Sequence, residues 1–262
     1  MLSRFCLLVA VFAWPVLSQP PQESLETALK LFNSGKYQQC FEIVSPYVQQ
    51  HPDSSAARKI LGMDQYMLGK PRDALQELLR ATELNPKDAD AFYYLGRLYF
   101  SADNAVAALA AFQKSLELDP SSVRATTQLG QTYEALGHMT DAERAYRKAI
   151  ELEEQQPKKS EWPYYNLGLL YVNTGHAAQS VPYFRQALAR NPAFPEAKIK
   201  LAVVLVKQNL SSEAQKLLEG AIQDDPRNSE AHYRLALLLA KAGKREEAQQ
   251  QFALFEKYRR KR

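Results

Sequence analysis

Apolar residues along this chain recur with the spacing of helices. In one stretch Phe92, Leu95 and Tyr99 fall at i, i+3 and i+7. Ala108 and Phe112 follow at i and i+4. This spacing places apolar side chains on one face of an amphipathic α-helix. The pattern therefore predicts two amphipathic helices in quick succession, each with one face turned toward a core.

The helical pattern repeats every 34 residues. The dipeptide Leu-Gly marks the period at 61–62, 95–96 and 129–130, and it recurs at 167–168 after four additional residues. Self-similarity at such a period is the signature of a repeat architecture. We expect seven units with a connector inserted after the fourth, at residues 21–54, 55–88, 89–122, 123–156, 157–160 (connector), 161–194, 195–228 and 229–262.

The position between the two helices of each unit is restricted to three residue types. A helix commonly ends at a residue with left-handed backbone geometry, which glycine adopts freely and which Asn and Asp tolerate. Each unit is therefore predicted to form a helix, a tight turn and a second helix. The seven turn positions are Gly35, Gly69, Asp103, Gly137, Gly175, Asn209 and Gly243.

Two further positions of each unit hold only small residues, which predicts that the paired helices approach closely there. Cys40 occupies one of these positions, so we expect it to fill a small buried space rather than to act as a reactive thiol. The eighth position holds Ala28, Gly62, Gly96, Gly130, Gly168, Ala202 and Ala236. The twentieth holds Cys40, Ala74, Ala108, Ala142, Ser180, Ala214 and Ala248.

These motifs resemble the tetratricopeptide repeat (TPR), in which Leu-Gly, Tyr, Ala, an aromatic residue and Pro stand at fixed offsets. The resemblance covers residues 21–262 and implies an all-α, right-handed α-solenoid of seven helix-turn-helix units, similar to exported bacterial members of the family. In such a solenoid, stacked neighbours supply the core, and Tyr99, Tyr133 and Tyr171 are expected at the junctions between units. The third unit carries Leu95, Gly96, Tyr99, Ala108, Phe112 and Pro120.

The fourth unit departs from the repeat pattern. Glu154 stands where proline is expected, and the insertion 157–160 follows. We interpret the insertion as a longer connector that locally changes the superhelix; a domain boundary at this point is the alternative.

The positions that point away from the core face of each first helix are candidates for partner binding. By resemblance, this face lines the concave groove of the TPR family, where extended peptides or partner helices bind. Aromatic and arginine side chains are common anchors at interfaces, although packing within the groove would explain the same residues. The candidate groove residues are Tyr93, Arg97, Phe100, Arg124, Gln131, Trp162 and Tyr165.

Some family members clamp a partner's terminal carboxylate with Lys and Asn. In this chain the ninth position of the units lacks Asn altogether, so we expect no clamp of that type. Protein or peptide partners are expected, and no small-molecule substrate.

The first 18 residues have the layout of a secretory signal peptide. Arg4 precedes the apolar stretch 5–17, and Val16 and Ser18 stand at the −3 and −1 positions before Gln19. This predicts cleavage after Ser18 and a periplasmic or secreted protein; an uncleaved membrane anchor is the alternative. Cys6 would be removed, which leaves one cysteine and no intramolecular disulfide.

The formal net charge of +4 originates at the C-terminus. Five cationic residues lie in the segment Lys257–Arg262, and the rest of the chain after the predicted signal peptide carries a small net negative charge. This distribution argues against nucleic-acid binding over the whole surface. The basic tail either ends the last helix favourably or contacts anionic lipid or nucleic acid.

Candidate catalytic chemistry is sparse. His138 and His176 follow turn glycines in adjacent units, but without carboxylate or cysteine neighbours they are interpreted as solvated turn residues rather than as a metal site. The pair Glu153-Glu154 is interpreted as part of a solvated helix face. No metalloprotease, nucleophile-elbow, phosphate-loop or CxxC motif occurs, and no cofactor is expected.

The sequence therefore predicts a non-enzymatic scaffold or adaptor of the cell envelope that holds partner segments in its groove during assembly of a larger complex. A membrane-surface tether, attached by the basic tail or by an uncleaved N-terminus, is the alternative.

Overall fold

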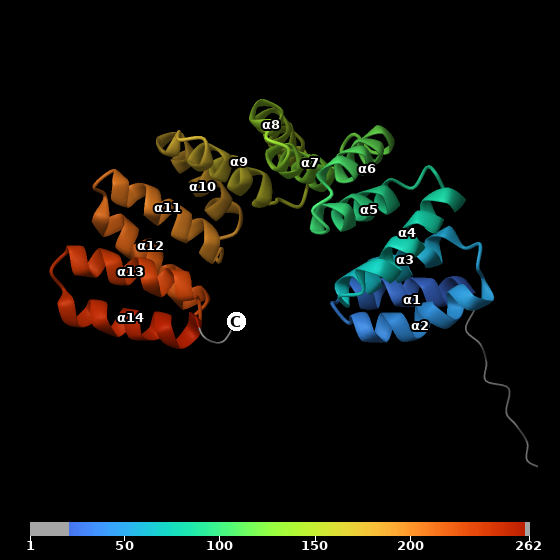
Figure 1. The fold of residues 1–262 in the computed structure, drawn as a ribbon, viewed down its shortest axis with the longest axis horizontal. Helices are drawn as coiled ribbons and strands as arrows, with labels where there is room; N and C mark the ends of the chain where they lie inside the picture. Colours follow the sequence, from blue (N-terminus) through green and yellow to red (C-terminus); the bar gives the residue numbers. More distant parts are fainter. Residues whose placement is uncertain (1–20, 260–262) are drawn as a thin grey trace, which may run out of the picture. The chain divides into compact units, whose positions relative to one another are not determined.

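The computed structural model describes residues 21–259, and every regular element among them is an α-helix (Figure 1). The all-α fold class is thus confirmed. The predicted signal peptide and the last three residues of the basic tail lie outside the described residues. The helices are α1 (Pro21–Asn33), α2 (Tyr37–Gln50), α3 (Ser55–Met67), α4 (Pro71–Leu84), α5 (Ala89–Ser101), α6 (Ala105–Leu118), α7 (Val123–Ala135), α8 (Met139–Glu154), α9 (Trp162–Asn173), α10 (Ala177–Arg190), α11 (Pro195–Lys207), α12 (Ser211–Asp224), α13 (Ser229–Lys241) and α14 (Arg245–Arg259).

The chain divides between Asn85 and Pro86 into two compact units. Helices α1–α4 form two hairpins in the first unit, and α5–α14 form five hairpins in the second. Within each unit, consecutive helices lie side by side and pair as the 34-residue period predicts (Figure 1). The connector 157–160 lies inside the second unit.

Polar side chains fix where several first helices begin. Ser54, Asp88, Ser122 and Asn228 precede α3, α5, α7 and α13, and each side-chain oxygen accepts a hydrogen bond from the backbone N–H three residues later. Such N-caps satisfy a backbone donor that has no partner within the helix, and each stabilises the helix by about 1 kcal/mol. All four stand at the last position of a repeat, so the caps also set the register of the units.

The seven turn positions adopt left-handed backbone geometry, as predicted. The five glycines have φ between 73° and 84°, and Asp103 and Asn209 have φ of 56° and 62°. In the first hairpin the N–H of Lys36 donates to the carbonyl of Leu31 at 2.9 Å, which closes the end of α1. The turn residues therefore end each first helix and reverse the chain within three residues.

The small positions are buried in all seven hairpins, which confirms the close approach of the paired helices. Four of the eighth positions are glycines, and each faces a bulky side chain from the second helix of its own hairpin. A Cβ atom added to Gly168 would lie 2.7 Å from the ring of Phe184, and one added to Gly62 would lie 2.8 Å from Leu78. The ring of Phe184 is fully buried and fills the space that the glycine leaves.

The tyrosines expected at the junctions between repeats lie there. Tyr171 is buried in a cluster with Tyr146 and Leu167, and Tyr133 packs against this cluster while partly exposed. Tyr99 likewise packs, partly exposed, against the cluster around Phe112. Both clusters draw residues from two adjacent repeats, so they join one hairpin to the next.

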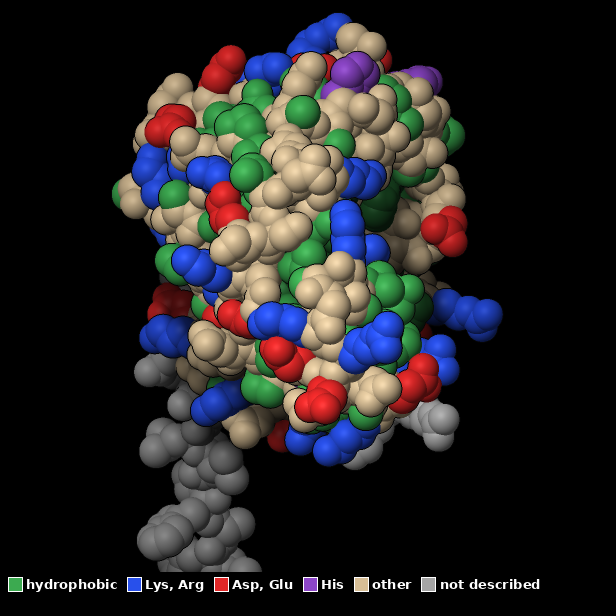
Figure 2. Space-filling view, turned by 90° about the vertical axis from the view of Figure 1, so that its left-hand side faces the viewer, with side chains coloured by type: hydrophobic (Ala, Val, Ile, Leu, Met, Phe, Trp, Pro, Cys, Tyr) green, Lys and Arg blue, Asp and Glu red, His purple; other side chains and the backbone are tan. Residues whose placement is uncertain are grey.

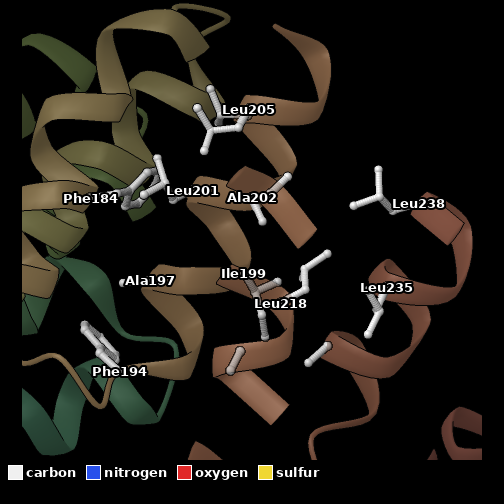
Figure 3. Close-up of a cluster of buried hydrophobic side chains, with 14 of the residues drawn as sticks. Phe184, Phe194, Ala197, Ile199, Leu201, Ala202, Leu205, Leu218, Leu235 and Leu238 are labelled. Carbon is white, nitrogen blue, oxygen red and sulfur yellow. The ribbon is translucent and has the colours of Figure 1, made fainter. Parts of the chain in front are cut away.

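The largest core cluster extends over the later repeats of the second unit. Figure 3 shows Phe184 of α10, Leu201 and Leu205 of α11, and Leu218 of α12 directed toward a common interior, with Leu235 of α13 beside them. This continuous apolar packing is what stacked hairpins supply to one another.

The first unit buries a carboxylic acid. Asp64 of α3 has no exposed surface, and neither carboxylate oxygen makes a hydrogen bond of normal geometry within the described residues. Burial raises the pKa of Asp64 from 3.8 to about 6, against the opposing effects of the Cys40 thiol and the Lys70 ammonium. Cys40 is fully buried beside it, as its small position predicts, and burial raises the pKa of this thiol to about 12.

The Gly168–Phe184 contact can be tested by complementary substitution. Gly168→Ala should lower the free energy of unfolding by about 1–3 kcal/mol, because the new methyl group overlaps a ring that cannot move. Helix propensity alone would predict the opposite, because it favours Ala over Gly by about 1 kcal/mol. Adding Phe184→Leu should recover part of the loss, since Ala202 and Leu218 occupy the equivalent positions of the sixth repeat and lie in one buried cluster. Urea unfolding of the four chains of this double-mutant cycle measures the coupling.

Gly175→Ala is the control for this cycle. Its φ is 84° and nothing lies within 4 Å of an added Cβ, so its cost is purely conformational. It should show no coupling to Phe184→Leu. Additive energies for the Gly168 and Phe184 substitutions would contradict the proposed packing.

The pKa of Asp64 predicts a pH-dependent stability. The folded state binds the proton more tightly than the unfolded state, so this carboxyl stabilises the fold below pH 4 relative to neutral pH, and the stability falls as the pH rises through 6. The loss at neutral pH should be on the order of 2–3 kcal/mol. Asp64→Asn should remove this dependence, as measured by hydrogen exchange of α3 and by melting between pH 4 and 7. The exposed Asp73→Asn controls for the lost charge, and identical pH profiles for wild type and Asp64→Asn would contradict the assignment.

Candidate functional site

A polar pocket of about 750 Å³ opens within the second unit. Its walls come from the first helices of three successive repeats, α5, α7 and α9, together with the turn before α7 and the segment that joins α8 to α9. The lining residues are Tyr93, Arg97, Asp119, Ser121, Ser122, Val123, Arg124, Thr127, Gln128, Gln131, Glu153, Gln156, Lys158, Ser160, Trp162 and Asn166.

The structure brings five of the seven candidate groove residues together in this pocket: Tyr93, Arg97, Arg124, Gln131 and Trp162. They come from equivalent faces of α5, α7 and α9, which the stacking of repeats places next to one another. The other two candidates, Phe100 and Tyr165, do not line the pocket. Phe100 is partly buried and packs against the Phe112 cluster.

Cation–π contacts organise the α5 and α7 side of the pocket. The guanidinium carbon of Arg124 lies 4.4 Å from the centre of the Tyr93 ring, and that of Arg97 lies 5.9 Å from the same ring. Arg124 also donates a hydrogen bond to Asp90, 34 residues earlier in the chain. The buried tyrosine therefore holds two arginines from neighbouring repeats at the pocket wall, an arrangement that favours anionic or carbonyl groups of a ligand.

An unsatisfied amide lies at the α9 wall. Asn166 is only 4% exposed, and its Oδ1 accepts a hydrogen bond from Nε2 of Gln131 at 3.3 Å. Its Nδ2 is buried and has no hydrogen-bond partner within the described residues. Leaving a buried donor unpaired costs about 1–3 kcal/mol. Asn166 lines the pocket, so a ligand carbonyl that reached Nδ2 would satisfy this donor.

Trp162 forms an exposed aromatic wall, whereas Tyr165 is part of the core. Trp162 is 49% exposed, and its ring contacts Phe194 edge-on at 5.1 Å between centroids. Tyr165 is 8% exposed, and its ring packs at a tilt against Phe194 and Phe184, with centroids 4.8 and 6.0 Å away. Burial raises the pKa of Tyr165 to about 12. Tyr165 thus supports the Trp162 wall from behind and is unavailable for direct contact with a ligand.

The connector 157–160 is held in place by a buried carboxylate. Glu153 has no exposed side-chain surface. Its Oε1 accepts a hydrogen bond from the backbone N–H of Ser160 at 3.1 Å, and its Oε2 accepts from Tyr164 at 3.1 Å and from Arg190 at 3.3 Å. The prediction of a solvated Glu153 is therefore wrong, because α9 and α10 cover this end of α8.

A second set of contacts closes the connector. The ammonium of Lys159 donates to the carbonyls of Glu153 and Glu154, at 3.2 and 2.8 Å. Glu154, which replaces the usual proline, forms an ion pair with Arg190 at 2.6 Å. The guanidinium of Arg190 also lies 3.8 Å from the centre of the Tyr164 ring. These contacts hold Lys159 and Ser160 against the end of α8, and Lys158 and Ser160 line the pocket.

The two turn histidines do not form a metal site within the described residues. His138 and His176 are exposed, and no group of three or more His, Cys, Asp or Glu side chains within residues 21–259 could hold a metal ion. On the face shown in Figure 2, cationic and anionic side chains are interspersed, with apolar side chains between them. Within the described part of the tail, Arg259 pairs with Glu256 at 2.9 Å.

Within residues 21–259, no helix combines the length and the apolar character that spanning a bilayer requires.

Comparison with known families identifies the repeat. Models of the tetratricopeptide repeat match residues 61–123, 121–193, 171–221 and 211–259. Together these matches cover residues 61–259, most of the chain. The chain therefore belongs to the tetratricopeptide-repeat family, and the fold class predicted from its sequence, a solenoid of helix-turn-helix repeats, is confirmed.

Among curated proteins, a 68-residue stretch is 32% identical to the photosystem I assembly protein Ycf3 of Cyanophora paradoxa. It covers 26% of this chain and 39% of that relative, so the chain matches well under half of the relative's length.

Two solved structures illustrate the likeness of fold. YrrB, described as a TPR protein with an unusual peptide-binding site, is 23% identical, with a TM-score of 0.53 over 70% of this chain and 93% of its own. PilW, described as a type IV pilus biogenesis factor, is 18% identical, with a TM-score of 0.68 over 76% of this chain and 90% of its own. At these identities the likeness concerns the fold.

The buried carboxylate of Glu153 predicts a large effect of its removal. Glu153→Ala should lower the free energy of unfolding by about 3 kcal/mol, because it leaves Arg190 without its buried partner and the Ser160 N–H without an acceptor. Hydrogen exchange at Ser160 should accelerate in parallel. Glu151→Ala is the matched control, because Glu151 is exposed and pairs only with Lys148 on the same helix, and it should cost less than about 0.5 kcal/mol. Equal effects of the two substitutions would show that Glu153 does not fix the connector.

Proposed function

We propose that this chain is a non-enzymatic interaction scaffold of the cell envelope that binds extended segments of partner proteins in the α5–α7–α9 pocket during assembly of a larger complex. The observation that carries the proposal is the convergence of Tyr93, Arg97, Arg124, Gln131 and Trp162 from three repeats in the pocket that Asn166, with its unpaired Nδ2, also lines.

The chemistry of the pocket suits a peptide. An extended backbone offers carbonyl acceptors at regular intervals, and Asn166 supplies a buried donor for one of them. Trp162 provides an exposed aromatic surface for a side chain, and the arginines favour carboxylates or carbonyls. The connector adds Lys158 to the rim, so the insertion enlarges the cationic part of the site.

The relatives support the same type of role. One similar structure is described as having a peptide-binding site, another as a pilus biogenesis factor, and the curated relative as an assembly protein. A shared fold alone does not determine function, so the weight rests on the pocket. The cell-envelope location is inferred from the signal-peptide pattern in residues 1–18.

Selection of peptides from a random display library, followed by affinity measurement, tests this proposal. Peptides selected by the purified wild-type chain should bind the Asn166→Asp variant about tenfold more weakly, because this isosteric change keeps the acceptor for Gln131 and removes the Nδ2 donor. Trp162→Ala should weaken binding similarly, and it should lower the melting temperature somewhat, because the half-exposed ring also packs against Phe194.

Asn173→Asp is the matched control, since Asn173 is exposed on the same helix and does not line the pocket. It should bind like the wild type. Failure to select any peptide, or equal affinities for wild type, Asn166→Asp and Trp162→Ala, would contradict the proposal.

A further inference from the structure

A second, smaller cavity of about 260 Å³ lies farther along the second unit, between α11 and α13. Its apolar surface comes from Val203, Val206, Leu237 and Leu238, with Leu218 of α12 beneath. Leu238 of α13 and Ala202 of α11, both labelled in Figure 3, line the cavity as well. Leu237 is 43% exposed, so the cavity presents an apolar side chain to solvent.

The charged residues around this cavity are all cationic: Lys207, Arg234 and Lys241 line it, and no acidic residue does. Lys207 and Lys241 are exposed and form no ion pair within residues 21–259. Arg234 reaches Glu230 only at 3.4 Å, and Lys200 approaches the same carboxylate oxygen at an equal distance. The Nε of Arg234 is buried and has no hydrogen-bond partner in the described part of the chain.

The chemistry of the first-helix face thus changes along the unit. The ninth position holds Arg97 and Gln131 in the third and fourth repeats, but Val203 and Leu237 in the sixth and seventh. An occupant of the second cavity must bury apolar surface against these valines and leucines and also carry negative charge near three cations. A phosphate-rich ligand would pair with the cations but leave the apolar surface uncovered. A protein segment that carries both apolar side chains and carboxylates is complementary to the whole cavity.

We infer that the cavity between α11 and α13 is a second binding site, specific for protein segments in which apolar side chains are flanked by Asp or Glu. The apolar side chains occupy the space between Val203 and Leu237, and the carboxylates face Lys207, Arg234 and Lys241. This site is separate from the polar pocket of the proposed function and takes a ligand of different chemistry.

Fluorescence anisotropy with three labelled peptides and the full chain tests this inference. The parent peptide alternates Leu with Glu; one variant replaces every Glu with Lys, and the other replaces every Leu with Ser. The parent should bind at least about tenfold more tightly than either variant, because each variant loses one of the two complementary features. Raising the salt concentration should weaken binding of the parent peptide, since the pairs with Lys207 and Lys241 are exposed.

Matched protein variants locate the binding. Leu237→Ser and the double substitution Lys207→Glu/Lys241→Glu should each weaken binding of the parent peptide about tenfold. Leu210→Ser and Lys216→Glu serve as controls, because both residues are exposed on the second unit and lie outside this cavity. Asn166→Asp should also leave this affinity unchanged, which separates the second site from the polar pocket.

The inference would be overturned by no binding of the parent peptide, by equal binding of parent and Lys-containing peptides, or by equal affinities for wild type and Leu237→Ser. A loss of binding in Asn166→Asp would likewise overturn it, because the peptide would then occupy the polar pocket.

Discussion

Close approach of two helices within each hairpin is the constraint on which the rest of this structure depends. At the eighth position of a repeat the backbone of the first helix passes so near the second that only Gly or Ala occurs, and a bulky side chain from the second helix fills the space. The partner side chain differs between repeats: Gly96, Gly130 and Gly168 face the rings of Phe112, Tyr146 and Phe184, whereas Gly62 faces Leu78. Because interiors are close-packed, this fit sets the distance and angle between paired helices.

Repetition of that hairpin determines where function can arise. Identical hairpins place equivalent faces of successive first helices next to one another, so side chains that are 34 or 35 residues apart in sequence meet directly, as Gln131 and Asn166 do. The connector 157–160, which interrupts the repeat pattern, also lies at the polar pocket. Glu153 and the connector it holds form one wall of the polar pocket, and departures from local rules are expected at functional sites.

The fold was predictable from the sequence because its determinants are local and periodic. Each determinant reflects a requirement of the backbone that distant residues do not alter. The turns need left-handed geometry, the small positions need close approach of two helices, and both recur every 34 residues. Most of the pocket was predictable too, since the helical period indicates which side chains share a face. The helical period does not indicate which neighbouring residues cover that face. Tyr165 was predicted on the same face of α9 as Trp162, yet Phe194, from the segment between α10 and α11, packs over it.

Two determinants of the site escaped sequence reasoning for the same reason. Asn166 lies in an apolar stretch of α9 at a position outside the predicted face, and only the neighbouring Gln131 reveals its role. Glu153 resembles any acidic residue of a solvated helix until α9 and α10 fold over it. A polar residue inside an otherwise apolar helix was the available signal for Asn166, because burial of an amide requires a partner.

The most direct test of this account is a crystal structure of the chain in complex with a bound partner peptide. The peptide should lie along α5, α7 and α9, with a backbone carbonyl accepting a hydrogen bond from Nδ2 of Asn166. A peptide bound instead to the second helices, α6, α8 and α10, would contradict the claim that stacked hairpins build the binding surface from their first helices.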